Sequence, residues 1–193
     1  MRIVAIDASR RTGFVSTSVE TAARAAEDAG AQVVRVRLRD TRIRTCTGCG
    51  MCHVSGSCKI DDDLPELAHE IADADGVIFG TPSYFRQPDD PVKAIIDRLG
   101  GYFRSPGEAR RASTGLPRVQ RAVIITACMA PEPLATFFGY TTGPIRELRR
   151  ALGSGGFRTI GSLAVTDTWR RPSVHAWERD KAASLGRVLA GKI

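Results

Sequence analysis

The fold is decided near the start of the chain, by the stretch Arg2-Ile3-Val4-Ala5-Ile6-Asp7-Ala8-Ser9-Arg10-Arg11-Thr12-Gly13-Phe14-Val15-Ser16-Thr17-Ser18-Val19. Its apolar run, Ile3–Asp7, is typical of a strand that is covered on both faces. A polar loop follows, and apolar residues then recur at helical spacing at Val19, Ala22, Ala23 and Ala26. A buried strand, a polar loop and an amphipathic helix in this order predict the first unit of an α/β domain.

The same alternation continues to the end of the chain. Apolar runs predict further strands at Val77–Gly80, Ala122–Thr126 and Ile160–Val165, with helical stripes between them. In Gln32–Leu38, apolar residues alternate with arginines, so one face is wet and we expect this strand at a sheet edge. Five strands alternating with helices, the second strand at an edge, predict a flavodoxin-like, doubly wound parallel sheet in the order 2-1-3-4-5.

Composition narrows the class of protein. With 193 residues, 42% of them hydrophobic, and no internal repeat, we expect a single domain over residues 1–193. The net charge of +7 comes from scattered arginines, which disfavours nucleic acid as a partner and favours phosphate-bearing cofactors. No run of about 18 apolar residues offers a membrane span. The N-terminus also enters a strand without the apolar region of a signal peptide, so we expect a cytoplasmic protein with reduced cysteines.

The sheet topology selects three loops for ligand binding, those that begin at residues 8, 81 and 127, because ligands bind outside the carboxyl ends of the strands. The first loop runs into a helix N-terminus, where free N–H groups and the helix dipole favour a phosphate. The hydroxyl and guanidinium groups that it offers belong to Ser9, Arg11, Ser16, Thr17 and Ser18. The alternative is that Thr17-Ser18-Val19-Glu20 is a helix capping box, which gives Ser9, Arg11 and Ser16 no role.

The second loop carries Pro82, Ser83, Tyr84 and Phe85. An aromatic pair beside backbone amides at this position is suited to frame a flat heterocycle and to bind its polar edge. Packing of Tyr84 and Phe85 in the core is the alternative. Beside a phosphate loop on the adjacent strand, the pattern predicts a mononucleotide with a planar ring. A polar excursion at 104–118 is either a lid over this region or a plain connection.

A cysteine loop at 46–58 holds four of the five cysteines within 13 residues, at Cys46, Cys49, Cys52 and Cys58. Thiolates at this spacing suit a 4Fe–4S cluster, which needs a short loop that wraps around it. Zinc, a disulfide or free thiols are the alternatives, and zinc ligands more often come as two separated pairs. The loop follows the second strand, and we therefore expect it at the same end of the sheet as the phosphate loop.

The chain resembles the NAD(P)H-dependent FMN reductase-like branch of the flavodoxin fold, and within it the iron–sulfur flavoproteins. Residues 1 to about 127 carry the resemblance, through Ala8-Ser9-Arg10-Arg11, Thr81-Pro82-Ser83-Tyr84-Phe85, Lys93 through Asp97-Arg98, and the cysteine loop followed by Asp62-Asp63-Leu64. The resemblance implies an FMN phosphate on Ser9, Arg11 and Ser16–Ser18 and a flavin ring against Pro82–Phe85. It also implies a 4Fe–4S cluster on the four cysteines, and homodimers or homotetramers whose interface covers the flavin.

We therefore expect an FMN-dependent oxidoreductase. NAD(P)H or a donor protein reduces the flavin, and electrons leave as a pair to a small quinone-like acceptor or singly through the cluster to an electron-transfer protein. No side chain is predicted as a catalytic acid, base or nucleophile. The alternatives are a non-enzymatic, flavodoxin-like electron carrier, and a flavin reductase whose cysteines are structural or bind zinc.

Overall fold

The computed structural model describes residues 1–55, 58–102 and 120–191. The polar excursion expected at 104–118 lies outside the described residues. No described helix is long and apolar enough to cross a membrane.

The described chain forms a parallel sheet in the order β2-β1-β3-β5-β6. The bounds of the strands are Gln32–Arg37 (β2), Arg2–Asp7 (β1), Gly76–Tyr84 (β3), Arg121–Ala127 (β5) and Arg158–Val165 (β6). This order confirms the predicted flavodoxin-like arrangement, with the fourth and fifth predicted strands appearing as β5 and β6. The strand with alternating arginines, β2, lies at the edge as expected.

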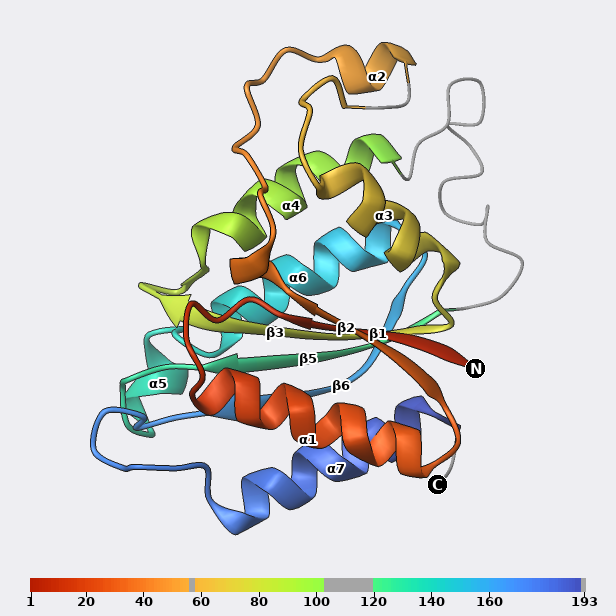
Figure 1. The fold of residues 1–193 in the computed structure, drawn as a ribbon. Coiled ribbons are helices and arrows are strands. Elements are labelled where there is room, and N and C mark those ends of the chain that lie inside the picture. The colour runs from red at the N-terminus through yellow and green to blue at the C-terminus, as the bar shows by residue number, and fades with distance from the viewer. Residues whose placement is uncertain (56–57, 103–119, 192–193) are drawn as a thin grey trace.

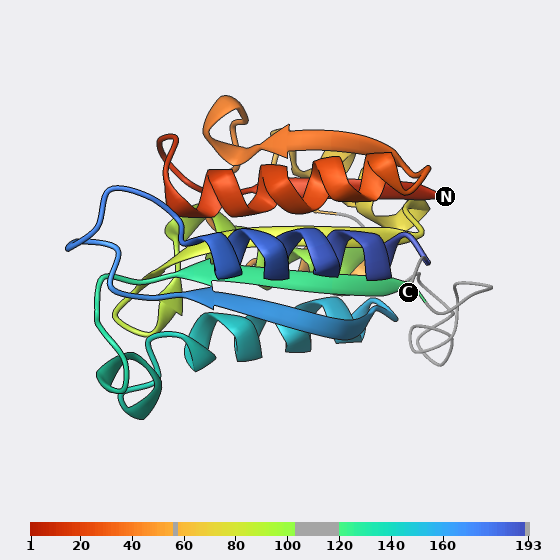
Figure 2. The same ribbon diagram turned by 90° about the horizontal axis from the view of Figure 1, so that it is seen from below.

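Helices cover both faces of the sheet (Figures 1 and 2). One face carries α1 (Phe14–Asp28) and α7 (Ala176–Leu189), and the other carries α3 (Leu64–Asp73), α4 (Asp90–Tyr102) and α6 (Thr142–Ser154). Short helices complete the description: η1 (Leu38–Asp40), α2 (Met51–Ser55) and α5 (Leu134–Phe137).

Alternation along β1 explains the two layers. Val4 and Ile6 pack in the core with α3 and α4, whereas Ile3 and Ala5 pack in the core with α1 and α7. Because successive side chains of a strand point to opposite faces, a continuous apolar run produces two cores. Strand β1, which lies between β2 and β3, is therefore buried on both sides.

One glycine brings α1 close to the end of β3. A Cβ atom at Gly80 would lie 2.2 Å from Cγ2 of Val19 and 2.9 Å from Cγ1 of Val15, so a larger residue would push the helix away. The first turns of α1 consequently lie beside the end of β3, which matters for the site described below.

The third strand is longer than the sequence indicated. We predicted that it ends at Gly80, but β3 continues to Tyr84 because the short strand β4 (Gln87–Pro88) folds back and pairs with Ser83 and Tyr84. The loop expected to begin at residue 81 is therefore a tight hairpin turn at Phe85 and Arg86. Both residues have positive φ angles, 46° and 72°.

Candidate functional site

Parallel pairing brings three connections together at the carboxyl ends of the strands, which form one end of the sheet (Figure 1). They are the β1–α1 loop, the hairpin turn after β3 and the segment after β5. The carboxyl ends of β1 and β3 are joined directly, since the N–H of Ala8 donates to the carbonyl of Gly80 over 2.9 Å. The predicted phosphate loop and the predicted ring loop therefore lie on neighbouring strands at the switch point of the sheet.

The β1–α1 loop is organised around a carboxylate that the sequence analysis did not single out. Asp7 is buried and accepts hydrogen bonds from the N–H and hydroxyl of Ser9 and from the hydroxyl of Ser16, at 2.5–2.9 Å. The two serine hydroxyls are also 2.6 Å apart. Arg39 approaches the same carboxylate at 3.8 Å. Asp7 is the polar last residue of an otherwise apolar strand, and that position was the signal available in the sequence.

The helix that follows has an open N-terminus. Helix α1 begins at Phe14 after Gly13, with no side-chain cap among the described residues and no acidic residue in its first turn. Its first N–H groups and the positive end of its dipole can therefore bind an anion. The capping-box alternative is wrong, because Thr17 and Glu20 lie inside the helix rather than at its start.

The structure brings part of the predicted phosphate set together. Ser9 and Ser16 are in contact, and Arg11 lies exposed in the same loop without an ion pair to any described residue. Thr17 is exposed one turn into α1. Ser18 is different, because its side chain is fully buried and its hydroxyl has no hydrogen-bond partner among the described residues. Its side chain therefore lies in the core rather than in the loop.

The hairpin turn exposes its aromatic pair. Tyr84 is 51% exposed and Phe85 is 88% exposed, so the alternative that they pack in the core is wrong. Pro82 and Ser83 precede them in β3, and the Ser83 hydroxyl is buried without a hydrogen-bond partner in the described chain. Unpaired buried hydroxyls are uncommon, which makes Ser83 a candidate donor to a ligand.

Helix α6 holds the turn from behind. A Cβ atom at Gly143 would lie 2.0 Å from the carbonyl oxygen of Arg86, so the first turn of α6 touches the hairpin backbone directly. This contact supports the left-handed backbone at Phe85 and Arg86, a conformation that costs free energy for residues other than glycine. The exposed aromatic side chains thus project from a well-supported backbone.

An ion pair joins the two loops. Arg10 Nε and Nη2 each lie 3.3 Å from a carboxylate oxygen of Asp89, which directly precedes α4. The N–H of Asp89 donates in turn to the hydroxyl of Thr81 over 3.4 Å. Arg10 is largely exposed, so this pair contributes little to stability, but it fixes the β1–α1 loop against the hairpin. The sequence analysis missed both residues of this pair.

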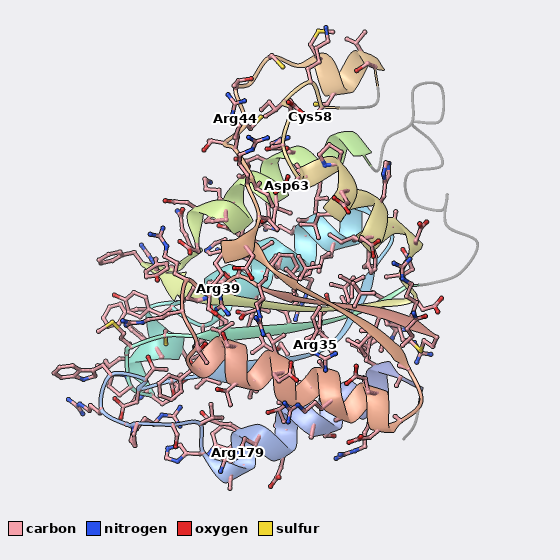
Figure 3. All side chains as sticks on the ribbon, in the orientation of Figure 1. Arg35, Arg39, Arg44, Cys58, Asp63 and Arg179 are labelled. Carbon is pink, nitrogen blue, oxygen red and sulfur yellow. The ribbon has the colours of Figure 1, made fainter. Side chains whose placement is uncertain are left out.

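A basic pocket extends from the β1–α1 loop. It has a volume of about 470 Å³ and runs from Asp7, Ser16 and Thr17 along α1 and β2. Four arginines line it: Arg24, Arg35, Arg37 and Arg39. Figure 3 shows Arg35 and Arg39 on this side of the molecule. Arg24 and Arg35 pair with Glu20, and Arg39 pairs with Asp7, so most of this positive charge is balanced by carboxylates of the pocket itself.

The cysteine loop occupies a different place from the one expected. It leaves the sheet edge after η1, but it then passes over α4 and away from the strand ends (Figure 1). All five cysteines are free thiols. Cys46 and Cys49 are exposed, Cys52 lies in α2, and Cys58 lies next to Arg98 of α4. The expectation that the loop opens beside the phosphate loop therefore holds only for its start.

The pKa values of two cysteine thiols are shifted in opposite directions. The N–H of Met51 and the hydroxyl of Thr47 favour the thiolate of Cys49 and lower its pKa. Burial instead raises the pKa of Cys128, which is 4% exposed after β5. Reactive thiolates are exposed and have a low pKa. Cys49 is consequently the thiol best suited to react, and Cys128 is a core residue.

Two cofactors can be tested against these residues. FMN fits, because the open N-terminus of α1 and Arg11 suit its phosphate and the exposed aromatic pair suits its ring. A cluster fits only by ligand type. Four thiols stand in one short loop, with Gly48 and Gly50 at positive φ, but the described residues contain no group of three or more ligands that could hold a metal ion. The loop would have to close further around a cluster.

These features form a candidate flavin site on a flavodoxin-like sheet, and comparison with known proteins shows the family of the chain. The sequence profile of the NADPH-dependent FMN reductase family matches residues 1–115, which is more than half of the chain. The protein belongs to this family of flavin oxidoreductases, as its motifs indicated.

The curated relatives are named iron-sulfur flavoproteins. One from Archaeoglobus fulgidus is 34% identical over 97 residues, which are 50% of this chain and 44% of the relative. The chain spans about half the length of the curated relatives that it matches. The family match over residues 1–115 covers both the β1–α1 loop and the cysteine loop.

Solved structures show the same fold over the whole chain. A flavone reductase gives a TM-score of 0.75 at 19% identity, covering 99% of this chain and 62% of that one. An NAD(P)H:quinone oxidoreductase from Methanothermobacter marburgensis gives 0.69 at 16% identity, covering 98% and 97%. At such identities the likeness shows the fold.

A substitution at Asp7 tests the position of the FMN phosphate independently of the position of the flavin ring. Replacing Asp7 with asparagine keeps a carbonyl oxygen for Ser9 and Ser16 but removes a negative charge from the loop. We expect FMN to bind about tenfold more tightly, since one repulsion at short range in a partly solvated site is worth about 1–2 kcal/mol. Isothermal titration of the flavin-free protein measures this change.

Riboflavin, which has no phosphate, is the matched ligand for that experiment. Its affinity should stay the same in Asp7→Asn. An equal change for FMN and riboflavin, or weaker FMN binding in the variant, would show that the phosphate does not lie at the β1–α1 loop.

Proposed function

We propose that the protein is an FMN-dependent oxidoreductase that takes electrons from NAD(P)H and passes them to a small quinone-like acceptor. One observation carries this proposal: the open N-terminus of α1 and the exposed Tyr84–Phe85 pair lie on neighbouring parallel strands, joined by the Arg10–Asp89 pair. That arrangement suits a phosphate at one end and a flat ring at the other. The family match and the quinone oxidoreductase among the similar folds support it.

The residues of this chain bind and orient the cofactor. Arg11 and the first N–H groups of α1 would hold the phosphate, and Arg39 would offset the charge of Asp7. Tyr84 and Phe85 would form a wall for the ring, and Ser83 would meet its polar edge. FMN, when bound, supplies the chemistry of accepting a hydride and releasing electrons in pairs or singly. No side chain has to act as an acid or base.

The proposal predicts catalysis rather than simple storage of electrons. Under anaerobic conditions, the FMN-saturated protein mixed with excess NADPH or NADH and a benzoquinone should oxidise many nicotinamides per chain. Absorbance at the nicotinamide band measures this turnover, with free FMN at the same concentration as control. Oxidation of one nicotinamide per flavin, and no more, would identify a non-enzymatic electron carrier instead.

We further propose that Cys46, Cys49, Cys52 and Cys58 hold a 4Fe–4S cluster. Four thiols of one loop and the names of the curated relatives support this assignment, and the low pKa of Cys49 favours a thiolate ligand. Anaerobic purification should give about four irons and four acid-labile sulfides per chain. Cys49→Ser should lose them, whereas Cys128→Ser should keep them. Stoichiometric zinc without sulfide would contradict the cluster.

A homo-oligomer that covers the site is also proposed, because large apolar side chains are exposed at the edge of the sheet that carries the site. Phe85, Met129 and Phe137 are 65–88% exposed, and they come from the connections that follow β3 and β5. Exposed apolar groups gathered in this way mark interaction surfaces. A second copy is the partner that the family resemblance implies.

Sedimentation of the FMN-bound protein at micromolar concentration should therefore show a dimer or a larger assembly. Phe137→Asp should shift it towards monomer, because a charge would be buried in the interface. Val54→Asp is the matched control, since Val54 is 73% exposed but lies on α2, away from this edge. A monomeric wild-type protein, or dissociation caused by Val54→Asp alone, would contradict this interface.

A further inference from the structure

Arg98 of α4 is the least expected residue in the core. It is 1% exposed, and it is the largest fully buried side chain in the described chain. Arginine is rarely buried to this degree unless its charge is paired and its N–H groups are satisfied. Of the three charged residues in the stretch Lys93 through Asp97-Arg98, only Arg98 is buried, whereas Lys93 and Asp97 are exposed. The hydrogen bonds of its guanidinium group explain why this charge is buried.

The guanidinium of Arg98 binds the segment that carries the cysteine loop at three points. Nη1 and Nη2 donate to the two carboxylate oxygens of Asp62, at 2.5 and 2.9 Å. Nη1 also donates to the carbonyl of Arg44 over 2.8 Å. Nε donates to the sulfur of Cys58 over 3.3 Å. Arg44 precedes the cysteine loop, Cys58 ends it and Asp62 follows it.

Asp62 and Asp63 draw the two ends of the segment together. Asp62 accepts the N–H of Arg44 over 2.8 Å, and Asp63 accepts the N–H of Arg42 over 2.6 Å. The N–H of Leu64, at the start of α3, donates to Asp62, although Asp63 is the residue that directly precedes the helix. Figure 3 shows Arg44, Cys58 and Asp63 gathered above α4.

Electrostatics keep this arrangement charged. Burial raises the pKa of the Asp62 carboxyl, but the Arg98 guanidinium and the N–H groups of Arg44 and Leu64 more than offset it, so its pKa lies below the ordinary value. The Asp62 carboxylate likewise raises the pKa of Arg98. A buried ion pair of this kind would satisfy both charges without the sulfur. The bond from Nε to Cys58 is therefore an additional contact that the pair does not require.

We propose that Arg98 is the positioning residue of the cysteine loop: it closes the loop at both ends and directs a hydrogen bond at the Cys58 sulfur, which tunes the thiol centre formed there. Hydrogen bonds to cysteine sulfurs stabilise the more electron-rich state of a thiolate centre and raise its reduction potential. The tuning part rests on the cluster proposed above, whereas the closing of the loop stands on the contacts alone.

Helix α4 connects the Arg98 contacts with the candidate flavin site. At its start, Asp89 holds Arg10 of the β1–α1 loop, and two turns further on Arg98 holds the cysteine loop. The eight residue steps from Asp90 to Arg98 span about 12 Å of helix. The candidate flavin site and the thiol region are thus attached to one rigid element, and Arg98 is the described connection on the thiol side.

The test needs a variant that still folds. Arg98→Gln alone leaves the Asp62 charge buried and unpaired, which is strongly destabilising. The double variant Arg98→Gln/Asp62→Asn is neutral at both positions, so the total charge of the pair is unchanged. The matched control is Arg171→Gln/Glu178→Gln, which removes another buried pair with two 2.7 Å contacts, far from the cysteines in sequence and on the α7 side.

Two measurements are made on each protein. Amide hydrogen exchange of residues 42–55 and 58–64 is compared with exchange in the sheet, without any metal added. Each protein is then reconstituted anaerobically with iron and sulfide, and the midpoint potential of the resulting centre is determined by titration.

We expect exchange in 42–55 and 58–64 to become about ten- to a hundredfold faster in Arg98→Gln/Asp62→Asn, as loss of charge-assisted hydrogen bonds implies. The control variant should leave these segments unchanged. The midpoint potential should shift to a more negative value in the Arg98 variant only. Because the charge of the pair is constant, that shift reports the lost bond to sulfur.

Unchanged exchange in these segments, or equal acceleration in the control, would overturn the positioning role. Faster exchange with an unchanged potential would overturn the tuning role. If the wild-type protein takes up no iron, the cluster and the tuning role fall together. The exchange measurement then decides the positioning role by itself.

Discussion

Parallel pairing of β1 with both β2 and β3 is the constraint on which the rest of the structure depends. Since all the strands of the main sheet point the same way, the connections that follow them emerge at one edge. The N–H of Ala8 on the carbonyl of Gly80 extends that pairing into the loops themselves. A helix N-terminus and an aromatic hairpin, far apart in the sequence, consequently become neighbours.

The β1–α1 loop combines features that oppose each other. The open end of α1 and the exposed Arg11 favour a phosphate, whereas the buried carboxylate of Asp7 repels one and occupies the hydroxyls of Ser9 and Ser16. A ligand phosphate must displace these contacts or share them. The group that holds the loop together is therefore also one that lowers its affinity for the phosphate.

The sequence predicted the sheet well because burial patterns are local. Period-2 alternation placed β2 at the edge, and the continuous apolar run of β1 placed it in the interior of the sheet. The details of the site depended on contacts that spacing does not reveal. Helix α1 begins directly after Gly13, so Ser18 lies within the helix and is buried in the core. Pairing with β4 extends β3 beyond Gly80.

The cysteine loop shows the same limit. Its cysteine spacing identified the thiol region, but its position over α4 depends on Arg98, which lies 36 residues after Asp62 and 54 after Arg44. A buried arginine in an amphipathic helix cannot be told from a surface one by sequence pattern. The tertiary pairing alone reveals it.

Binding of FMN at the carboxyl ends of β1 and β3 is the central claim, and direct analysis of the bound flavin tests it most simply. The protein is purified without added cofactor, incubated with excess FMN and freed of unbound flavin. Its visible spectrum and the flavin released on denaturation are then measured. The account predicts one FMN per chain in the wild-type protein, and little after Tyr84→Ala/Phe85→Ala in a chain that remains folded. Absence of bound FMN in the wild-type protein, or full occupancy without the two aromatic side chains, would contradict it.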